Sequence, residues 1–233
     1  MHILVINPNS TAAMTRSIEA AASDVARAKT RITAVNPVDT PPAIQGPEDG
    51  AAALPGLSRL FDEEVLGKGG YDACIIACFD DTGLMQLKRR SPIPVIGIGE
   101  AAFHAAMLVG GAFSVVTTLG VSVPVIEANL AAYGFASRCR KVRASEVPVL
   151  ALENDPEGSC ETIAGEISRA LADDKPDSIV LGCAGMADLA LTLSDRFHLP
   201  VIDGVATAVS FAEALRAANA DRWSGGLHGA QVA

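Results

Sequence analysis

Two segments of this chain share one pattern, and the repeat limits the folds that the chain can adopt. In each segment an Asp is followed by an apolar run, a small residue and a cysteine. The first runs from Asp72 to Cys78 and the second from Asp177 to Cys183, so both residues recur after 105 positions (177−72 and 183−78). A short apolar run of this kind is typical of a buried strand, and the repeat therefore predicts two structural units of one design.

A second shared motif supports the repeat. Pro94-Val95-Ile96 and Pro200-Val201-Ile202 follow the two cysteines and lie 106 positions apart (200−94). Apolar spacing predicts helices between these strands, and strands that alternate with helices build parallel sheets. We therefore predict an α/β fold with two similar parallel-sheet domains, related by pseudo-twofold symmetry, and an active site in the cleft between them. The predicted parts are residues 1–98 with 206–218 for the first domain, 99–205 for the second, and 219–233 for a loose C-terminal tail.

Local patterns predict further elements between the repeated strands. The segment 37–47 is rich in Pro and predicts a loop, and apolar spacing predicts a helix over 57–66. An extended segment is expected over 147–152. With these elements, each unit contains several strands joined by helices.

The composition fits a folded domain and argues against a nucleic-acid partner. Hydrophobic residues make up 49% of the chain and charged residues 19%, which supplies a sizeable core without a signature of disorder. The net charge is −9, and the basic clusters at 88–90 and 138–143 lack interleaved aromatic residues. We interpret both clusters as solvated surface or as subunit contacts, and we expect no binding of nucleic acid.

The sequence also argues against export and membrane insertion. The N-terminus enters an apolar strand at once, without the charged lead and cleavage site of a signal peptide. The uncharged segment 101–126 is divided by Gly110, Gly111 and Pro124, so we do not interpret it as a membrane span. We expect a cytoplasmic protein whose five cysteines are free thiols.

Cys78 and Cys183 are the candidate catalytic residues. Each follows a predicted strand, and ligands of parallel α/β sheets bind beyond the carboxyl ends of the strands. Each also precedes residues that can begin a helix, and a helix N-terminus lowers the pKa of a thiol. One such cysteine alone is more often buried and inert, as we expect for Cys74, but the matched context in both halves favours function. Two facing thiols can remove a proton from one face of a carbon and return one to the other face.

Polar residues follow the first strand of each unit. Asn9 and Ser10 come after an apolar run at the N-terminus, and Thr117 and Thr118 end the corresponding run in the second half. The first pair also fits a plain turn that caps a helix. Because all four lie at strand ends, we predict that their amides and hydroxyls hold a polar, uncharged ring.

We find no convincing motif for a metal or a cofactor. Gly97-Ile98-Gly99-Glu100-Ala101-Ala102 matches the dinucleotide pattern G-x-G-x-x-A, but no acidic residue follows about 20 positions later. The four histidines form no i, i+4 pair, and no C-x-x-C is present. We predict that the chain uses neither metal nor cofactor, and we interpret the Gly-rich segment as a tight strand-to-helix turn.

Three motifs together resemble those of the Asp/Glu/hydantoin racemase superfamily, and more closely its hydantoin racemase branch. They are Val5-Ile6-Asn7-Pro8-Asn9-Ser10-Thr11, Cys78-Phe79-Asp80-Asp81-Thr82-Gly83-Leu84 and Leu181-Gly182-Cys183-Ala184-Gly185-Met186. The resemblance runs from residue 3 to about residue 215. It implies two similar α/β domains, a cofactor-independent site between them, and Cys78 and Cys183 as its acid/base pair.

The reaction that the resemblance implies is racemisation of a 5-monosubstituted hydantoin. One cysteine, as thiolate, removes the proton from C5 of the ring, and the charge delocalises into the adjacent carbonyl as an enolate. The other cysteine, as thiol, protonates the opposite face. The residues expected to bind the substrate are Asn9, Ser10, Pro41, Ile44, Phe79, Asp80, Thr117, Thr118, Ala184 and Gly185.

The details of the resemblance bear on the substrate. Aspartate and glutamate racemases have Cys-Asn-Thr where this chain has Cys78-Phe79-Asp80, which argues for a neutral cyclic ureide rather than an amino acid. The segment around Pro41 and Ile44 resembles the variable pocket wall of the family, and its apolar side chains favour hydantoins over allantoin. A carboxylate beside Cys78 would raise the pKa of its thiol, so we expect Asp80 and Asp81 to turn away or to cap the following helix.

Two other functions stay open. Allantoin racemases share much of the same pattern. A non-catalytic ureide-binding protein on the same scaffold is a second alternative, although the presence of both thiols weighs against it. We also expect a homo-oligomer that acts on a small cyclic ureide.

Overall fold

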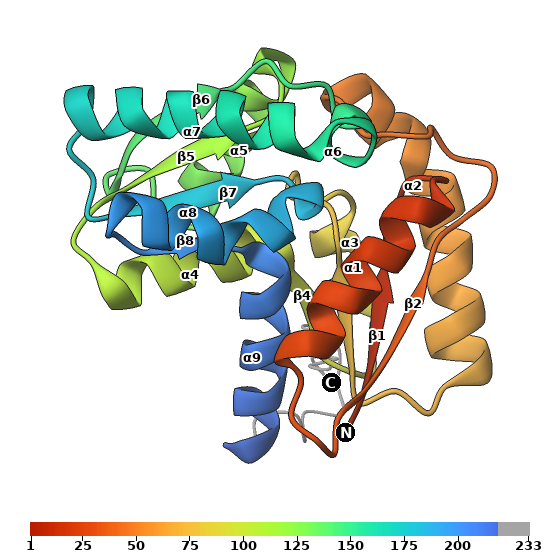
Figure 1. Cartoon of the computed structure of the whole chain (residues 1–233). Coiled ribbons are helices and arrows are strands. Elements are labelled where there is room, and N and C mark those ends of the chain that lie inside the picture. Colours follow the sequence, from red (N-terminus) through yellow and green to blue (C-terminus); the bar gives the residue numbers. More distant parts are fainter. Residues whose placement is uncertain (219–233) are drawn as a thin grey trace.

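The computed structural model describes residues 1–218, which form two parallel sheets of four strands each, covered by helices (Figure 1). The first sheet consists of β1 (His2–Ile6), β2 (Arg31–Val35), β3 (Ala73–Ile76) and β4 (Val95–Gly97). The second consists of β5 (Phe113–Thr117), β6 (Cys139–Ala144), β7 (Ser178–Gly182) and β8 (Val201–Ile202). The predicted α/β fold with two parallel sheets is confirmed. The predicted loose tail, 219–233, lies outside the described residues.

The two sheets have the same strand order. It is β2-β1-β3-β4 in the first and β6-β5-β7-β8 in the second, and every pair is parallel. The repeated aspartates have matching roles as well. Asp72, before β3, accepts a hydrogen bond from the backbone N–H of His2 at 2.7 Å. Asp177, before β7, accepts from the N–H groups of Gly111 and Ala112 at 2.7 and 2.9 Å. Each carboxylate therefore ties a central strand to the start of its neighbour, which explains why the repeat includes it.

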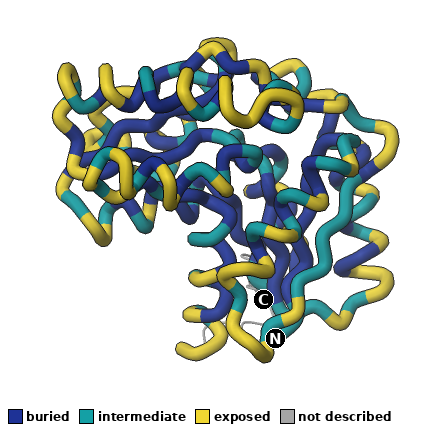
Figure 2. The backbone as a smooth tube through the Cα atoms, viewed as in Figure 1, coloured by how far each residue is buried: buried dark blue, intermediate teal, exposed yellow. Residues whose placement is uncertain are grey.

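Helices cover the sheets and leave the central strands β1, β3, β5 and β7 deeply buried (Figure 2). Side chains alternate along each strand, so Ile3 and Val5 enter one core cluster and Leu4 and Ile6 enter another. The helices are α1 (Ala12–Val25), α2 (Pro47–Phe61), a π-helical continuation (Asp62–Lys68), α3 (Leu84–Arg90), α4 (Ile98–Val109), α5 (Val123–Ala132), α6 (Ala151–Asn154), α7 (Pro156–Asp173), α8 (Ala190–Phe197) and α9 (Gly204–Ala217). Two 3-10 turns are Gly120–Ser122 and Ala184–Leu189.

One apolar core joins the two sheets. It contains Ile75 of β3, Val115 of β5 and Val180 of β7, with side chains of α4 and α9 between them. The chain enters the second unit at α4 and leaves it at α9, which packs against α1 and α4 and also contacts β3 and β4. The domain boundaries 1–98 with 206–218 and 99–205 stay a prediction, which we retain because α9 lies beside the first sheet (Figure 1).

The fourth strand of the second sheet lies elsewhere than predicted. The segment expected to be extended over 147–152 is irregular up to residue 150 and helical from Ala151, where α6 begins. The strand β6 is formed by Cys139–Ala144 instead. Arg143 in this strand is buried and forms ion pairs with Glu166 and Asp174 at 3.0 and 2.6 Å. The interpretation of 138–143 as a solvated or subunit surface was therefore wrong for Arg143, because its partners come from distant segments.

The helix expected over 57–66 starts ten positions earlier than predicted (57−47), inside the Pro-rich segment. Pro47 stands at the first turn of α2, where its missing N–H costs no hydrogen bond, and Glu48 and Asp49 complement the helix dipole there. The chain then continues as the π-helical turn Asp62–Lys68. The predicted loop over 37–47 is free of helix and strand except at Pro47, so the missed part of the helix is mainly 48–56.

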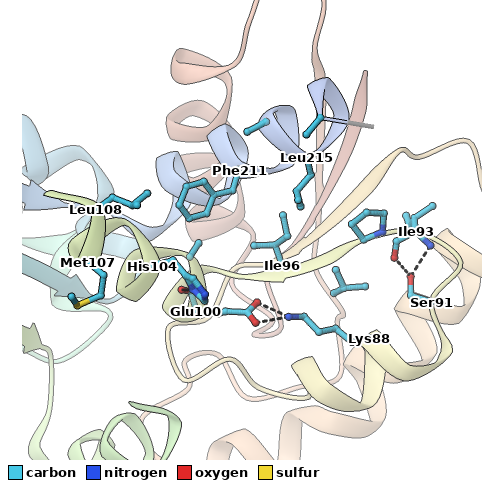
Figure 3. A pocket seen from close by; sticks show the side chains of 15 residues that line it. Lys88, Ser91, Ile93, Ile96, Glu100, His104, Met107, Leu108, Phe211 and Leu215 are labelled. Carbon is cyan, nitrogen blue, oxygen red and sulfur yellow. Dashed lines mark hydrogen bonds and ion pairs between the residues drawn. The ribbon is translucent and has the colours of Figure 1, made fainter. Parts of the chain in front are cut away.

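An apolar groove of about 740 Å³ lies beside the edge strand β4, between α4 and α9 (Figure 3). Ile96, Phe211 and Leu215 line it, and Lys88 and Glu100 form an ion pair at its polar side. Leu108 lines the groove as well, although 78% of its surface is exposed. Large apolar surfaces of this kind mark contacts with other molecules.

The close approach of α9 to α4 leaves no room for a side chain at Gly204. A Cβ atom at Gly204 would lie 2.5 Å from the carbonyl oxygen of Ile98, which belongs to backbone. We expect Gly204→Ala to lower the free energy of unfolding by about 1–3 kcal/mol. The matched control is Gly165→Ala in α7, where a Cβ meets nothing within 4 Å. Because alanine favours helix, the control should raise the free energy of unfolding by about 0.5–1 kcal/mol in urea titrations. Equal stabilities for the two variants would contradict this packing.

Candidate active site

The predicted site residues follow the two central strands of each sheet. Asn9 follows β1 and Cys78 follows β3, while Thr118 follows β5 and Cys183 follows β7. Parallel strands end at one edge of their sheet, so each sheet presents one cysteine beside one polar side chain. The four residues line a common cavity, to which both sheets contribute.

The cavity is small and mostly apolar. Its volume is about 30 Å³, enough for a water molecule or two but not for a substituted five-membered ring. Met14 and Val149 pack together at its wall and contact Cys183. The residues that line it are Asn9, Met14, Ile44, Ala77, Cys78, Phe79, Asp80, Thr118, Ser122, Val149, Gly182, Cys183 and Ala184.

Each thiol sulfur accepts a hydrogen bond from the N–H group two residues further along the chain. The backbone N–H of Asp80 donates to Cys78, and that of Gly185 donates to Cys183. The hydroxyl of Thr82 also donates to the sulfur of Cys78 at 3.5 Å. These donors favour the thiolate form, and they arise from the same turn geometry after β3 and after β7.

The pKa values of both thiols are nevertheless raised, contrary to the expectation from helix N-termini. Burial raises the pKa of Cys183 to about 11, and the charge of Asp80 adds to this. Burial followed by the Asp80 charge raises the pKa of Cys78 further. Cys183 does precede a 3-10 turn, but α3 begins only at Leu84, too far from Cys78 to assist it. The described side chains around the cavity also include no cation that would offset desolvation.

Asn9 is oriented by its own loop. Its side-chain oxygen accepts hydrogen bonds from Nδ2 of Asn7 and from the N–H of Thr11, both at 2.9 Å. Its Nδ2 group is left with a weak contact to the sulfur of Met14 at 3.7 Å. The loop therefore turns a hydrogen-bond donor toward the cavity, as a carbonyl-bearing ligand requires.

The two aspartates after Cys78 have different environments. Asp81 faces away from the cavity, and its carboxylate accepts from the N–H groups of Gly99 and Glu100, at the start of α4, at 3.1 and 2.8 Å. It thus caps a helix, as expected, although that helix is α4 rather than α3. Asp80 does not turn away from the thiols: it lines the cavity, and burial raises its pKa to about 7, an effect that a hydrogen bond with Ser122 opposes.

Four of the predicted substrate-binding residues do not line the cavity. The N–H of Ser10 donates to the carbonyl of Pro41 at 3.0 Å, so these two join the β1 loop to the Pro-rich segment. The hydroxyl of Thr117 donates to the carbonyl of Gly182 at 2.8 Å and holds β5 to β7. Gly185 contributes its N–H to Cys183.

Several residues of the site were missed by sequence reasoning. Met14, Ser122 and Val149 line the cavity but come from helices or irregular segments without a repeated pattern. Asn7 and Thr82 lie inside the motifs that were recognised, and their roles were not assigned. Thr82 lies four positions after Cys78, and this spacing was the only signal in the sequence for its role.

The sequence of this chain matches the family model described as Asp/Glu/Hydantoin racemase over residues 3–212. The chain belongs to this family. A hydantoin racemase of Rhizobium meliloti is 48% identical over 216 residues, covering 92% of this chain and 88% of that protein. A hydantoin racemase of Pseudomonas sp. (strain NS671) is 40% identical, covering 92% and 86%. The predicted membership of the superfamily, and with it an isomerase activity of the racemase type, is confirmed.

Solved structures of similar proteins share this fold. An allantoin racemase from Klebsiella pneumoniae superposes with a TM-score of 0.91 at 40% identity, covering 98% of this chain and 91% of that chain. A glutamate racemase from Bacillus anthracis gives a TM-score of 0.65 at 19% identity, covering 94% and 83%, a likeness of fold alone. Proteins similar to this chain thus include both hydantoin racemases and allantoin racemases.

Within 1–218, His, Cys, Asp and Glu side chains do not gather in threes as a metal site requires. In the same part of the chain, every helix is too short or too polar to cross a membrane.

The raised pKa values predict how the thiols react with iodoacetamide. Because only the thiolate is alkylated, the rate should rise about tenfold per pH unit between about pH 7 and 10. Cys183 should react before Cys78, since its pKa is raised less. Mass spectrometry of the labelled peptides, with Cys160→Ala as background, measures both rates. Rapid, pH-independent labelling of either site thiol near pH 7 would contradict the burial described here.

Proposed function

We propose that the protein racemises 5-monosubstituted hydantoins by moving protons between C5 of the ring, Cys78 and Cys183. The observation that supports this most is that the two thiols follow corresponding strands of two similar sheets and line one cavity. Thiols that approach from two units can act on opposite faces of one carbon. The reaction needs no metal or cofactor, because the adjacent carbonyl of the ring accepts the charge.

The burial of the thiols suits a carbon acid as substrate. A thiolate held in an apolar cavity is a stronger base than one in water, because desolvation raises the pKa of its conjugate acid. The opposite thiol then donates its proton as the enolate collapses. Asn9 and Thr118 are proposed to bind ring carbonyls, where donors aimed at developing negative charge stabilise the transition state most.

Substrate entry requires the cavity to open. Met14 of α1 and Val149, in the segment before α6, belong to one apolar cluster at the cavity wall. We propose that the two units separate at this cluster and close again over the ring. Closure then excludes water from the thiols, which strengthens every electrostatic interaction in the site.

The cavity wall favours an apolar substituent at C5. Ile44, Phe79 and Val149 offer no side-chain hydrogen bond to a ureido group. Allantoin racemisation is the second candidate, because the similar solved structures include allantoin racemases. A non-catalytic ureide-binding protein would not need thiols in matching positions.

The expected homo-oligomer stays a prediction, and so does the cytoplasmic location. The groove beside β4 supports contact with a second copy. The exposed side chain of Leu108 lies at the same surface as the groove that Ile96 and Phe211 line. A surface that carries both a protruding side chain and a groove can be complementary to itself, as a contact between two identical chains requires.

Substitution of either thiol should abolish racemisation. We expect Cys78→Ala and Cys183→Ala each to lower the rate by at least about 10²-fold, since each removes one of the two proton-transferring groups. Cys160→Ala in α7 should leave the rate unchanged. Polarimetry of a single-enantiomer hydantoin measures all three. Full racemisation by either site variant would overturn the two-thiol mechanism, although one surviving thiol can still exchange the C5 proton of one enantiomer with solvent.

The wall residue Ile44 tests the substrate preference. The wild-type protein should have a higher kcat/KM for 5-benzyl- or 5-isopropylhydantoin than for allantoin, because an unpaired buried ureido group costs about 1–3 kcal/mol. Ile44→Asn should narrow this difference, whereas the isosteric Ile44→Leu should preserve it. Faster wild-type turnover of allantoin than of every alkyl or aryl hydantoin would replace the hydantoin assignment with the allantoin one.

A further inference from the structure

The cavity holds three acidic groups and no base among its described lining residues. Besides Cys78 and Cys183, Asp80 lines the same 30 Å³ cavity, and its charge acts on both sulfurs. Lys, Arg and His are absent from the side chains that line it. Two negative charges in so small an apolar space repel each other strongly, so we expect only one of the three groups to be ionised at a time.

The acidities of the three groups place that single charge on the carboxyl. Burial raises the pKa of Asp80 to about 7, which is still far below those of the thiols. Above neutral pH the ligand-free site therefore contains a carboxylate and two protonated thiols. A protonated thiol cannot remove a proton from C5, so the charge has to move from Asp80 to a sulfur before racemisation begins.

We propose that Asp80 exchanges protons with both thiols and so generates the thiolate that attacks C5. The inference rests on the racemase function proposed above and assigns that site a third proton-transferring group. Asp80 acts through the thiols and need not touch C5. Its placement supports this, since its own backbone N–H donates to the sulfur of Cys78 and its charge acts on both sulfurs.

The proton balance closes in both directions. The carboxylate of Asp80 first accepts the proton of one thiol and becomes a neutral acid. The thiolate then removes the C5 proton and forms the enolate. The opposite thiol protonates the other face and is left as a thiolate, which takes the proton from Asp80. The site returns to one carboxylate and two thiols, and the same steps serve the other enantiomer with the cysteines exchanged.

Both units of the molecule hold Asp80 in place. It belongs to the loop after β3, yet its carboxyl bonds with Ser122 and its backbone carbonyl accepts from Nδ2 of Asn129 at 2.9 Å, both from the second unit. The neighbouring charge, Asp81, is turned to α4 and Tyr133 instead. Contacts from both units therefore hold Asp80 at the cavity that the two thiols line.

The isosteric variant Asp80→Asn distinguishes a proton-accepting Asp80 from one that only repels the thiolates, because the two roles predict opposite changes in the racemisation rate. As a proton acceptor, Asp80 is needed, and we expect kcat near pH 7.5 to fall by about 10²-fold or more in the variant. In the ligand-free variant, where water can still take the proton of a thiol, the iodoacetamide rate of both thiols should rise, because a repelling charge is gone. If Asp80 merely repels the thiolates, the variant should racemise as fast as the wild type or faster. A large rise in KM with unchanged kcat would instead make Asp80 a ligand of the ring, and either result overturns the proposal.

The pH profile separates this role from a structural one. Wild-type kcat/KM should rise through about pH 7, as Asp80 becomes the carboxylate that can accept a proton. In Asp80→Asn the rise of kcat/KM through about pH 7 should be absent. The difference in kcat/KM between variant and wild type should shrink at higher pH, where the thiols ionise without Asp80. Asp80→Glu, which keeps a carboxyl, should recover part of the activity. Asp188→Asn, the same change at an exposed position outside the cavity lining, should match the wild type.

The outcomes also distinguish this proposal from the function on which it rests. A wild-type protein that racemises no hydantoin or allantoin contradicts the function itself. A wild-type racemase whose Asp80→Asn variant keeps its rate and its pH dependence contradicts only the role of Asp80. Circular dichroism melts of the variants identify any loss that comes from unfolding.

Discussion

The parallel direction of all the strands is the constraint on which the site depends. Because every strand of a sheet ends at one edge, the loops after β1 and β3 meet in the first unit, and those after β5 and β7 meet in the second. The apolar core shared through α4 and α9 then holds the two units together. Two thiols 105 positions apart (183−78) thus line one cavity without any direct bond between them.

Much of this architecture followed from the repeat in the sequence. Identical spacing of Asp72 and Cys78 with Asp177 and Cys183 predicted two similar units, and the apolar runs predicted their central strands. The edge strand β6 escaped notice because Arg143 becomes buried only through ion pairs with residues far along the chain. Local patterns report which residues are apolar, whereas burial of a charge depends on partners that only the fold supplies.

The chemistry of the site could be predicted less completely than its position. The sequence identified both thiols and suggested that helix N-termini would acidify them, but in the folded chain burial outweighs every donor near the sulfurs. The sequence also indicated that a carboxylate beside Cys78 would raise the pKa of its thiol, but it did not show where Asp80 and Asp81 would lie. In the folded chain burial raises the pKa values of Asp80 and of both thiols, and the charge of Asp80 raises those of the thiols further.

The central claim is that two thiols act on opposite faces of one carbon. Racemisation of a single-enantiomer hydantoin in heavy water, stopped after a few per cent of conversion, tests it most directly. The account predicts that the product carries deuterium at C5, because the second thiol has exchanged with solvent, while the remaining substrate keeps its protium. Product that retains the original C5 proton would show that one group both removes and returns it, and would contradict the account.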